Sequence, residues 1–178
     1  MPDCSVDYSV SPRSREDLRN LAAEIRKVLD LEDVLYFPIV ELLDVLEETL
    51  PGFTYSIIDD DELPANKHAE TNVYTGEIRI KESVYEGARR GKGRDRMTIA
   101  HEFSHFMTLC FLGFKLSRTI GGGKPRTYED PEWQAKCLAG ELLIPHDLVR
   151  GMTADEVVEK CGVSMDAARY QLEVASRR

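Results

Sequence analysis

Hydrophobic positions near the start of the chain recur at intervals of three and four, the spacing of one face of an α-helix. Ser14, followed three residues later by Asp17, predicts the cap of a helix over residues 14–29. A second helix is expected over residues 38–50, because Pro38 suits a first helical turn. The apolar stripe of the first helix consists of Leu18, Leu21, Ala22, Ile25, Val28 and Leu29.

The pattern then changes to an alternation of period two. Residues 53–58 predict a strand, and residues 71–80 predict a hairpin whose turn contains Gly76. Helical spacing returns further along, at residues 95–110, 131–143, 153–161 and 164–178. Helices, then strands, then helices predict an α+β fold with about six helices and a small antiparallel or mixed sheet.

The organisation into segments follows from the same pattern. Residues 1–13 contain scattered proline and serine and predict a loose leader, and residues 14–150 predict one globular domain. Residues 151–178 predict a helical hairpin that turns at Gly162 and packs on the domain or is appended to it. Its outline resembles a helix-turn-helix DNA-binding module. Few cations lie on its second helix, beside Asp166 and Glu173, so packing on the core is favoured over DNA contact.

The composition limits the kinds of partner that the protein is expected to bind. The 178 residues include 23 Lys and Arg against 32 Asp and Glu, a formal net charge of −9, which does not suit general binding of nucleic-acid phosphates. The cations between Arg79 and Arg96 alternate with acids, so we expect a solvated stretch there. There is no apolar run of about 18 residues and no signal-peptide pattern, so no membrane contact and a cytoplasmic location are expected. The four cysteines form no CxxC pair and predict reduced thiols.

The sequence His101-Glu102-Phe103-Ser104-His105 carries the chemistry. Residues four apart share one helical face, so both imidazoles can bind one metal ion. Glu102 can then act as general base toward a metal-activated water. The flanking residues are apolar and predict a buried helix, in which two histidines and a glutamate need polar partners. A metal ion supplies such partners.

A catalytic zinc usually has three protein ligands, so the chain must offer one more. Glu132 lies in the first turn of the helix that begins at Pro131 and could point toward the metal. Two histidines and one glutamate suit Zn²⁺, with other divalent ions such as Mn²⁺ possible. The candidates that the sequence leaves open are Glu129, Asp130, Glu132, Glu141 and His146.

Two segments resemble one known family. Residues 96–105 resemble the R-x-T-x-A-H-E-x-x-H segment of the ImmA/IrrE metallopeptidases, and residues 132–145 resemble their E-x-x-A-N-x-F-A-x-x-L-L-M-P signature. The resemblance implies a zincin-like fold, His101, His105 and Glu132 as metal ligands, and Glu102 as the catalytic base. The chain departs from the second signature at Lys136, Leu138, Gly140 and Ile144.

The resemblance also implies a function. Members of the family resemble site-specific endopeptidases that cleave or inactivate a helix-turn-helix repressor, often encoded nearby on a mobile element, and so relieve repression in a stress response. Two alternatives stay open. One is a non-catalytic regulator that binds DNA or a repressor and holds a structural metal, and the other is a toxin-like component of a two-gene module.

Two details of the mechanism stay open in the sequence. The donor that stabilises the oxyanion has three candidates, His68, Tyr74 and Tyr128. The strand at residues 77–80 is either an edge on which an extended substrate pairs or an ordinary interior strand.

Overall fold

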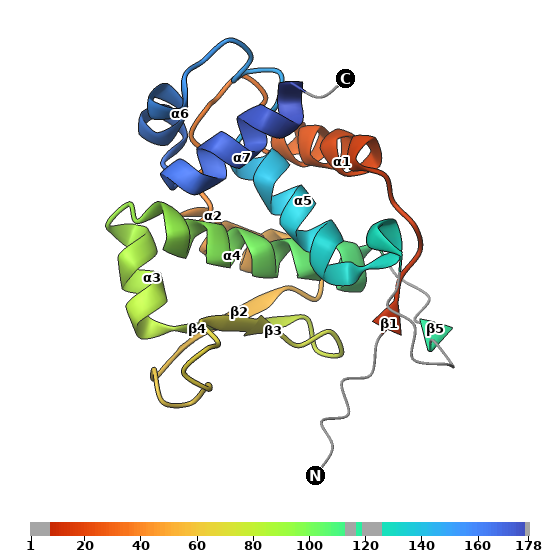
Figure 1. The fold of residues 1–178 in the computed structure, drawn as a ribbon. Helices are drawn as coiled ribbons and strands as arrows, with labels where there is room; N and C mark the ends of the chain where they lie inside the picture. Colours follow the sequence, from red (N-terminus) through yellow and green to blue (C-terminus); the bar gives the residue numbers. More distant parts are fainter. Residues whose placement is uncertain (1–7, 113–116, 119–125, 177–178) are drawn as a thin grey trace.

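The computed structural model describes residues 8–112, 117–118 and 126–176. In this part of the chain, seven α-helices accompany a mixed three-stranded sheet and most of them lie on one side of it, which confirms the expected α+β fold (Figure 1). Helix α1 (Arg15–Val28) begins with a reciprocal cap between Ser14 and Asp17. Helix α2 (Leu42–Thr49) begins four residues after Pro38, so the expected start was wrong. Residues 39–41 form turns instead, and Ile39 is buried in the core.

The sheet has the strand order β2-β4-β3. Strand β2 (Thr54–Ile58) is parallel to β4 (Glu77–Lys81), and β3 (Ala69–Thr71) is antiparallel to β4. The expected hairpin is confirmed as β3 and β4, joined through Gly76 at φ +77°. Because β4 is the central strand, the idea that residues 77–80 form a free edge is wrong. The edge strand β3 contacts the helix that contains His101 and Glu102, through Thr71.

Helix α4 (Gly93–His105) lies between the sheet on one side and helix α5 (Pro131–Leu143) on the other (Figure 1). It follows the short helix α3 (Glu82–Arg89) and continues into a π-helical turn at Phe106–Phe111. A 3₁₀ turn, η2 (Thr127–Glu129), leads into α5. A π-helical turn widens the backbone and is frequent at functional sites.

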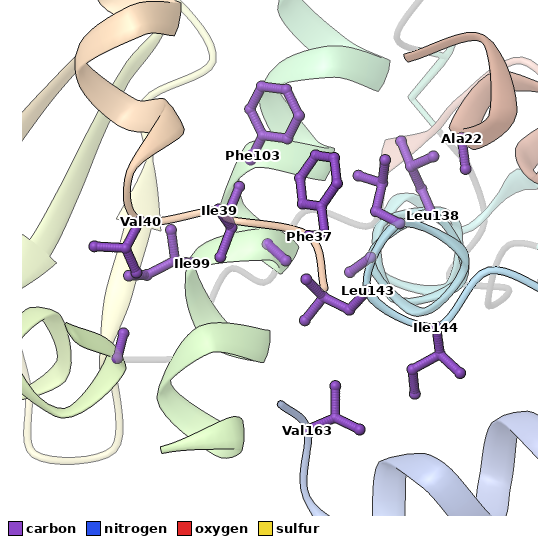
Figure 2. Packing of buried hydrophobic residues seen from close by; sticks show 14 of the residues in the cluster. Ala22, Phe37, Ile39, Val40, Ile99, Phe103, Leu138, Leu143, Ile144 and Val163 are labelled. Atoms are coloured by element: carbon purple, nitrogen blue, oxygen red, sulfur yellow. The ribbon is translucent and has the colours of Figure 1, made fainter. Parts of the chain in front are cut away.

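The hydrophobic core fills the space on both sides of α4 and extends between α1 and α5. Figure 2 shows Ile99 and Phe103 of α4 with Phe37 from the α1–α2 connection and Leu138 from α5. All four side chains are at most 1% exposed. The burial of α4 confirms the expectation from its apolar flanks.

The C-terminal hairpin packs on this core. Helix α6 (Ala154–Cys161) and helix α7 (Met165–Ser176) are joined at Gly162, which has φ +65°. Arg96, fully buried in α4, donates to the carbonyl oxygen of Gly162 at 3.0 Å and to that of Phe37 at 2.7 Å. The buried residues that the hairpin adds to the core are Val157, Cys161, Val163 and Ala168.

Residues 8–13, which the sequence places in a loose leader, are held against the domain. Strand β1 (Tyr8–Ser9) pairs with β5 (Ser117–Arg118). The backbone amide of Val10 donates to the carbonyl oxygen of Glu129 at 2.9 Å. The backbone amide of Arg13 donates to the carbonyl oxygen of Tyr128 at 3.0 Å. Residues 1–7 of the expected leader lie outside the described residues.

Within the described ranges, no helix has the length and apolar character needed to cross a bilayer. Cys110, Cys137 and Cys161 are free thiols, and the latter two are buried.

Candidate metal centre

Two imidazoles and one carboxylate meet at the cleft face of α4. His101 and His105 lie one helical turn apart, and their Nε2 atoms are 3.1 Å from each other. Glu132 Oε2 lies 3.2 Å from His101 Nε2, and Glu132 Oε1 lies 3.2 Å from His105 Nε2. The ligand-type atoms of the three residues all lie within 4.8 Å of one another. Helical spacing therefore brings the histidines together, and the packing of α5 on α4 brings the glutamate.

The start of α5 explains the position of Glu132. The Asp130 side chain caps the helix by accepting the amide of Glu132 at 2.9 Å, and Pro131 occupies the first turn. This cap holds the carboxylate at the positive end of the helix dipole. Hydrogen bonds from His101 and His105 hold the pKa of Glu132 far below its usual range. The carboxylate is therefore ionised, as a metal ligand must be.

The other residues proposed as a third ligand lie elsewhere. Glu141 is 1% exposed and accepts from Arg19 at 3.3 Å. His146 contacts Asp147 at 3.0 Å on the surface. Asp130 is engaged in the cap of α5, and Glu129 lies in the preceding 3₁₀ turn. Among the described residues, the group of convergent donors contains only His101, His105 and Glu132.

The donor set fits a divalent metal such as zinc. Two imidazole nitrogens and a carboxylate are a usual catalytic zinc set, with bonds of about 2.0–2.2 Å to each donor. Nitrogen and oxygen atoms 3.1–3.2 Å apart are compatible with one such centre. A metal ion would accept a lone pair from each Nε2 atom and from the Glu132 carboxylate, so the three residues present suit the group.

Glu102 is placed by a residue that sequence reasoning missed. Thr71 Oγ1 on strand β3 lies 2.7 Å from Glu102 Oε2 and 2.9 Å from the carbonyl oxygen of Glu102. The contact spans 31 residues of sequence. Nothing in the period-two pattern around Thr71 distinguishes it from any strand threonine. Only the packing of β3 against α4 identifies it.

A comparison with family models bears on these residues. The model described as the IrrE N-terminal-like domain, peptidase M78, matches residues 58–173. The chain belongs to this family. The match confirms the resemblance found at residues 96–105 and 132–145, and it supports a peptidase-type domain with a metal centre.

A comparison with solved structures supports the fold of this M78 domain. A Mycobacterium tuberculosis transcriptional regulator is similar, with a TM-score of 0.59 and 16% sequence identity. The likeness covers 89% of this chain and 46% of that regulator, so the chain spans about half of the regulator's length. At this identity the likeness shows the fold alone. A search of curated proteins gives no match.

The His101, His105 and Glu132 group of the M78 domain opens into a cleft of about 440 Å³ between β3 and α4. His68, one of the three oxyanion candidates, lines this cleft, and its Nε2 lies 3.5 Å from Arg94 Nη2. Tyr74 is 87% exposed and borders a different pocket at the hairpin turn. The hydroxyl of Tyr128 accepts from Arg126 at 3.0 Å, and Tyr128 is not among the residues that line the cleft.

Several cations of the basic stretch have partners within the M78 domain. Arg79 pairs with Glu62 at 2.7 Å and with Glu70 at 3.1 Å. Lys81 is 5% exposed and donates to a backbone carbonyl, and Arg96 is buried as described above. Arg89 and Arg90 both pair with Glu86. Lys92 and Arg94 of the same stretch are exposed.

Proposed function

We propose that this M78 domain is a zinc-dependent endopeptidase in which Glu102 is the general base. The observation that carries the proposal is the position of Glu102, which lines the same open cleft as the three convergent donors and lies on the same helix as two of them. A purely structural metal site is normally closed by four protein ligands, whereas a catalytic site keeps a position free. Three donors beside a carboxylate favour catalysis.

The proposed chemistry divides between the metal and the chain. Zinc held by His101, His105 and Glu132 would supply Lewis acidity toward water and toward the substrate carbonyl. Glu102 takes a proton from the attacking water onto its carboxylate and later delivers it to the departing amine nitrogen. Thr71 keeps the Glu102 carboxylate directed into the cleft through its hydroxyl. Water attacks the peptide carbonyl carbon, and the C–N bond breaks.

The substrate backbone has a natural partner in β3. The backbone amide of Asn72 donates to the carbonyl oxygen of Glu77, and the backbone amide of Lys81 donates to the carbonyl oxygen of His68. Residues 68 and 72 therefore direct their backbone groups toward β4. By alternation, Ala69 and Thr71 direct theirs away from β4, along the cleft edge. An extended peptide can therefore pair with this edge beside the catalytic carboxylate. This assigns to β3 the role that the sequence considered for residues 77–80.

Of the oxyanion candidates, we propose His68. It lines the cleft together with Glu102 and His101, whereas neither Tyr74 nor Tyr128 is among the lining residues. Its imidazole can donate a hydrogen bond to a developing negative charge. The protein substrate is proposed to be a helix-turn-helix repressor encoded nearby, which rests on the family resemblance.

The test is cleavage of that repressor by purified protein loaded with zinc. Glu102→Gln should abolish cleavage while zinc binding and repressor binding persist, since the amide keeps the shape of the side chain and cannot take the proton. Glu48→Gln, an exposed change on α2, is the matched control and should cleave normally. Cleavage by Glu102→Gln at the normal rate would overturn the role of Glu102. A wild-type protein that binds zinc and repressor but never cleaves would favour the non-catalytic regulator.

A further inference from the structure

A second cavity, of about 490 Å³, lies among α1, α4, α5 and α7. Its lining includes Met97, one turn before His101 on α4, and Trp133, the residue after Glu132 on α5. It shares no lining residue with the metal cleft. Its volume falls within the range of small-molecule sites, about 300–1,000 Å³. The aromatic and aliphatic walls include Met97, Trp133, Ile144, Ala167 and Tyr170.

Two buried polar groups in the lining have no hydrogen-bond partner. Gln171 is 2% exposed, and its Nε2 lies without an acceptor. Arg15 Nη1 is also buried without a hydrogen bond and lies 3.9 Å from Glu141 Oε1, beyond hydrogen-bonding distance. A buried donor left unpaired costs about 1–3 kcal/mol, so native proteins rarely keep two in one place. Both groups are donors, so the partner that suits them carries acceptor oxygens.

The charges around the cavity favour an anion. Arg15, which lines the cavity, shares the carboxylate of Glu141 with Arg19, and Arg19 lies closer to it, at 3.3 Å against 3.9 Å. Lys136 adds another cation to the lining. Burial raises the pKa of the Cys137 thiol to about 11, so this lining residue stays neutral. A carboxylate is therefore the head group that complements the cavity.

The aromatic residues indicate the body of the ligand. The Arg15 guanidinium carbon lies 5.8 Å from the centre of the Trp133 ring and 6.0 Å from that of the Tyr170 ring. Tyr170 also accepts from Arg15 Nη2 at 3.2 Å. Such an arrangement presents flat apolar faces beside a fixed cation, which suits a planar ring that carries an anionic group.

We propose that this cavity, which we call the Arg15–Gln171 cavity, is a binding site for a small aromatic carboxylate. The carboxylate accepts hydrogen bonds from Gln171 Nε2 and Arg15 Nη1, and the ring packs against Trp133 and Met97. Gly140 leaves room for the Gln171 amide, because a Cβ at that position would lie 3.1 Å from Gln171 Oε1. The proposal does not depend on proteolytic activity, since the cavity is separate from the metal cleft.

Trp133 is the single tryptophan of the chain, so its fluorescence reports on this cavity. The probe is 3-phenylpropionate, and the comparison compound is its uncharged amide, 3-phenylpropionamide. We expect saturable change of the Trp133 emission with the acid, and binding of the amide at least about tenfold weaker. Saturation-transfer NMR of the probes provides a second measurement that does not depend on a change in emission.

Variants separate the site from general attraction to the protein. Arg15→Met and Gln171→Leu should each weaken binding of the acid about tenfold or more. Arg150→Met removes the same charge from the exposed end of the α5–α6 connection and should bind as the wild type. Circular dichroism and zinc content check that each variant is folded. If a variant does not fold, the comparison of acid with amide on the wild type decides.

Three results would overturn the proposal. The first is that neither method detects saturable binding of the acid up to about 10 mM. The second is that the acid and the amide bind equally, and the third is that folded Arg15→Met binds the acid as well as the wild type does. Equal binding would mean that the cavity accepts any apolar ring and that its cations do not select.

Discussion

Thr71 Oγ1 lies between two acceptors of Glu102. It is 2.7 Å from the side-chain carboxylate of Glu102 and 2.9 Å from the backbone carbonyl oxygen of Glu102. A hydroxyl has one proton and can also accept. When Glu102 is ionised, Thr71 can donate to the carboxylate. When Glu102 holds the proton taken from water, it can donate to Thr71, whose proton then turns to the carbonyl. The hydroxyl therefore suits both protonation states of the proposed base.

Thr71→Val tests this relationship because it keeps the β-branched shape and removes the hydroxyl. We expect kcat to fall about tenfold, as the carboxylate loses its orienting contact, with KM little changed. Thr71→Ser should retain most of kcat. Steady-state cleavage rates and zinc content provide the measurement. A Thr71→Val enzyme with wild-type kcat would show that the contact is structural only.

Glu132→Ala should remove the metal. The two histidines alone leave the ion with two protein ligands, so we expect less than about a tenth of the wild-type zinc content. Mass spectrometry of the natively purified proteins measures this, with Glu129→Ala as the control. A chelator should also lower the melting temperature of the wild type, because it removes a ligand that binds only the folded state. Glu132→Ala that retains one zinc per chain would contradict the assignment.

Arg96 should matter for stability more than for the chemistry. Its side chain is fully buried, lies 3.9 Å from the centre of the Tyr36 ring and donates to the carbonyls of Gly162 and Phe37. Arg96→Met leaves those carbonyls unpaired, so the free energy of unfolding should fall by about 3 kcal/mol. Urea denaturation measures it. Arg89→Met, which breaks an exposed ion pair, should cost under about 1 kcal/mol.

The buried thiol of Cys137 predicts a loss of stability in alkali. Burial raises its pKa from 9.0 to about 11. The folded state thus holds the proton more tightly than the unfolded state, and this stabilisation is complete below pH 9 and is lost as the pH rises through 11. The free energy of unfolding should fall by roughly 2 kcal/mol across this range through this group. Urea titrations at each pH measure this free energy, which should fall less between pH 9 and 11 in Cys137→Ala than in the wild type. An equal fall in both proteins would contradict the prediction.

Features that depend on neighbours along the chain could be read from the sequence. The capping residues Ser14 and Thr153 act within one turn, and the hairpin around Gly76 closes over a few residues. The two histidines of the motif share a face because any α-helix places residues four apart together. These features depend on backbone geometry that every helix and strand has in common.

Other features of the fold and of the site depend on contacts between segments that are distant in the sequence. Glu132 meets His101 across 31 residues because α5 packs on α4. Residue types and spacing alone left five candidates open, and Glu132 was expected from the family resemblance. The edge position of β3 follows from the parallel pairing of β2 with β4, which sequence alternation does not encode. The proposed roles of Thr71 and of the unpaired Gln171 amide can be recognised only from the residues that other elements place around them. Local periodicity specifies which face of an element is apolar, and packing alone specifies what that face meets.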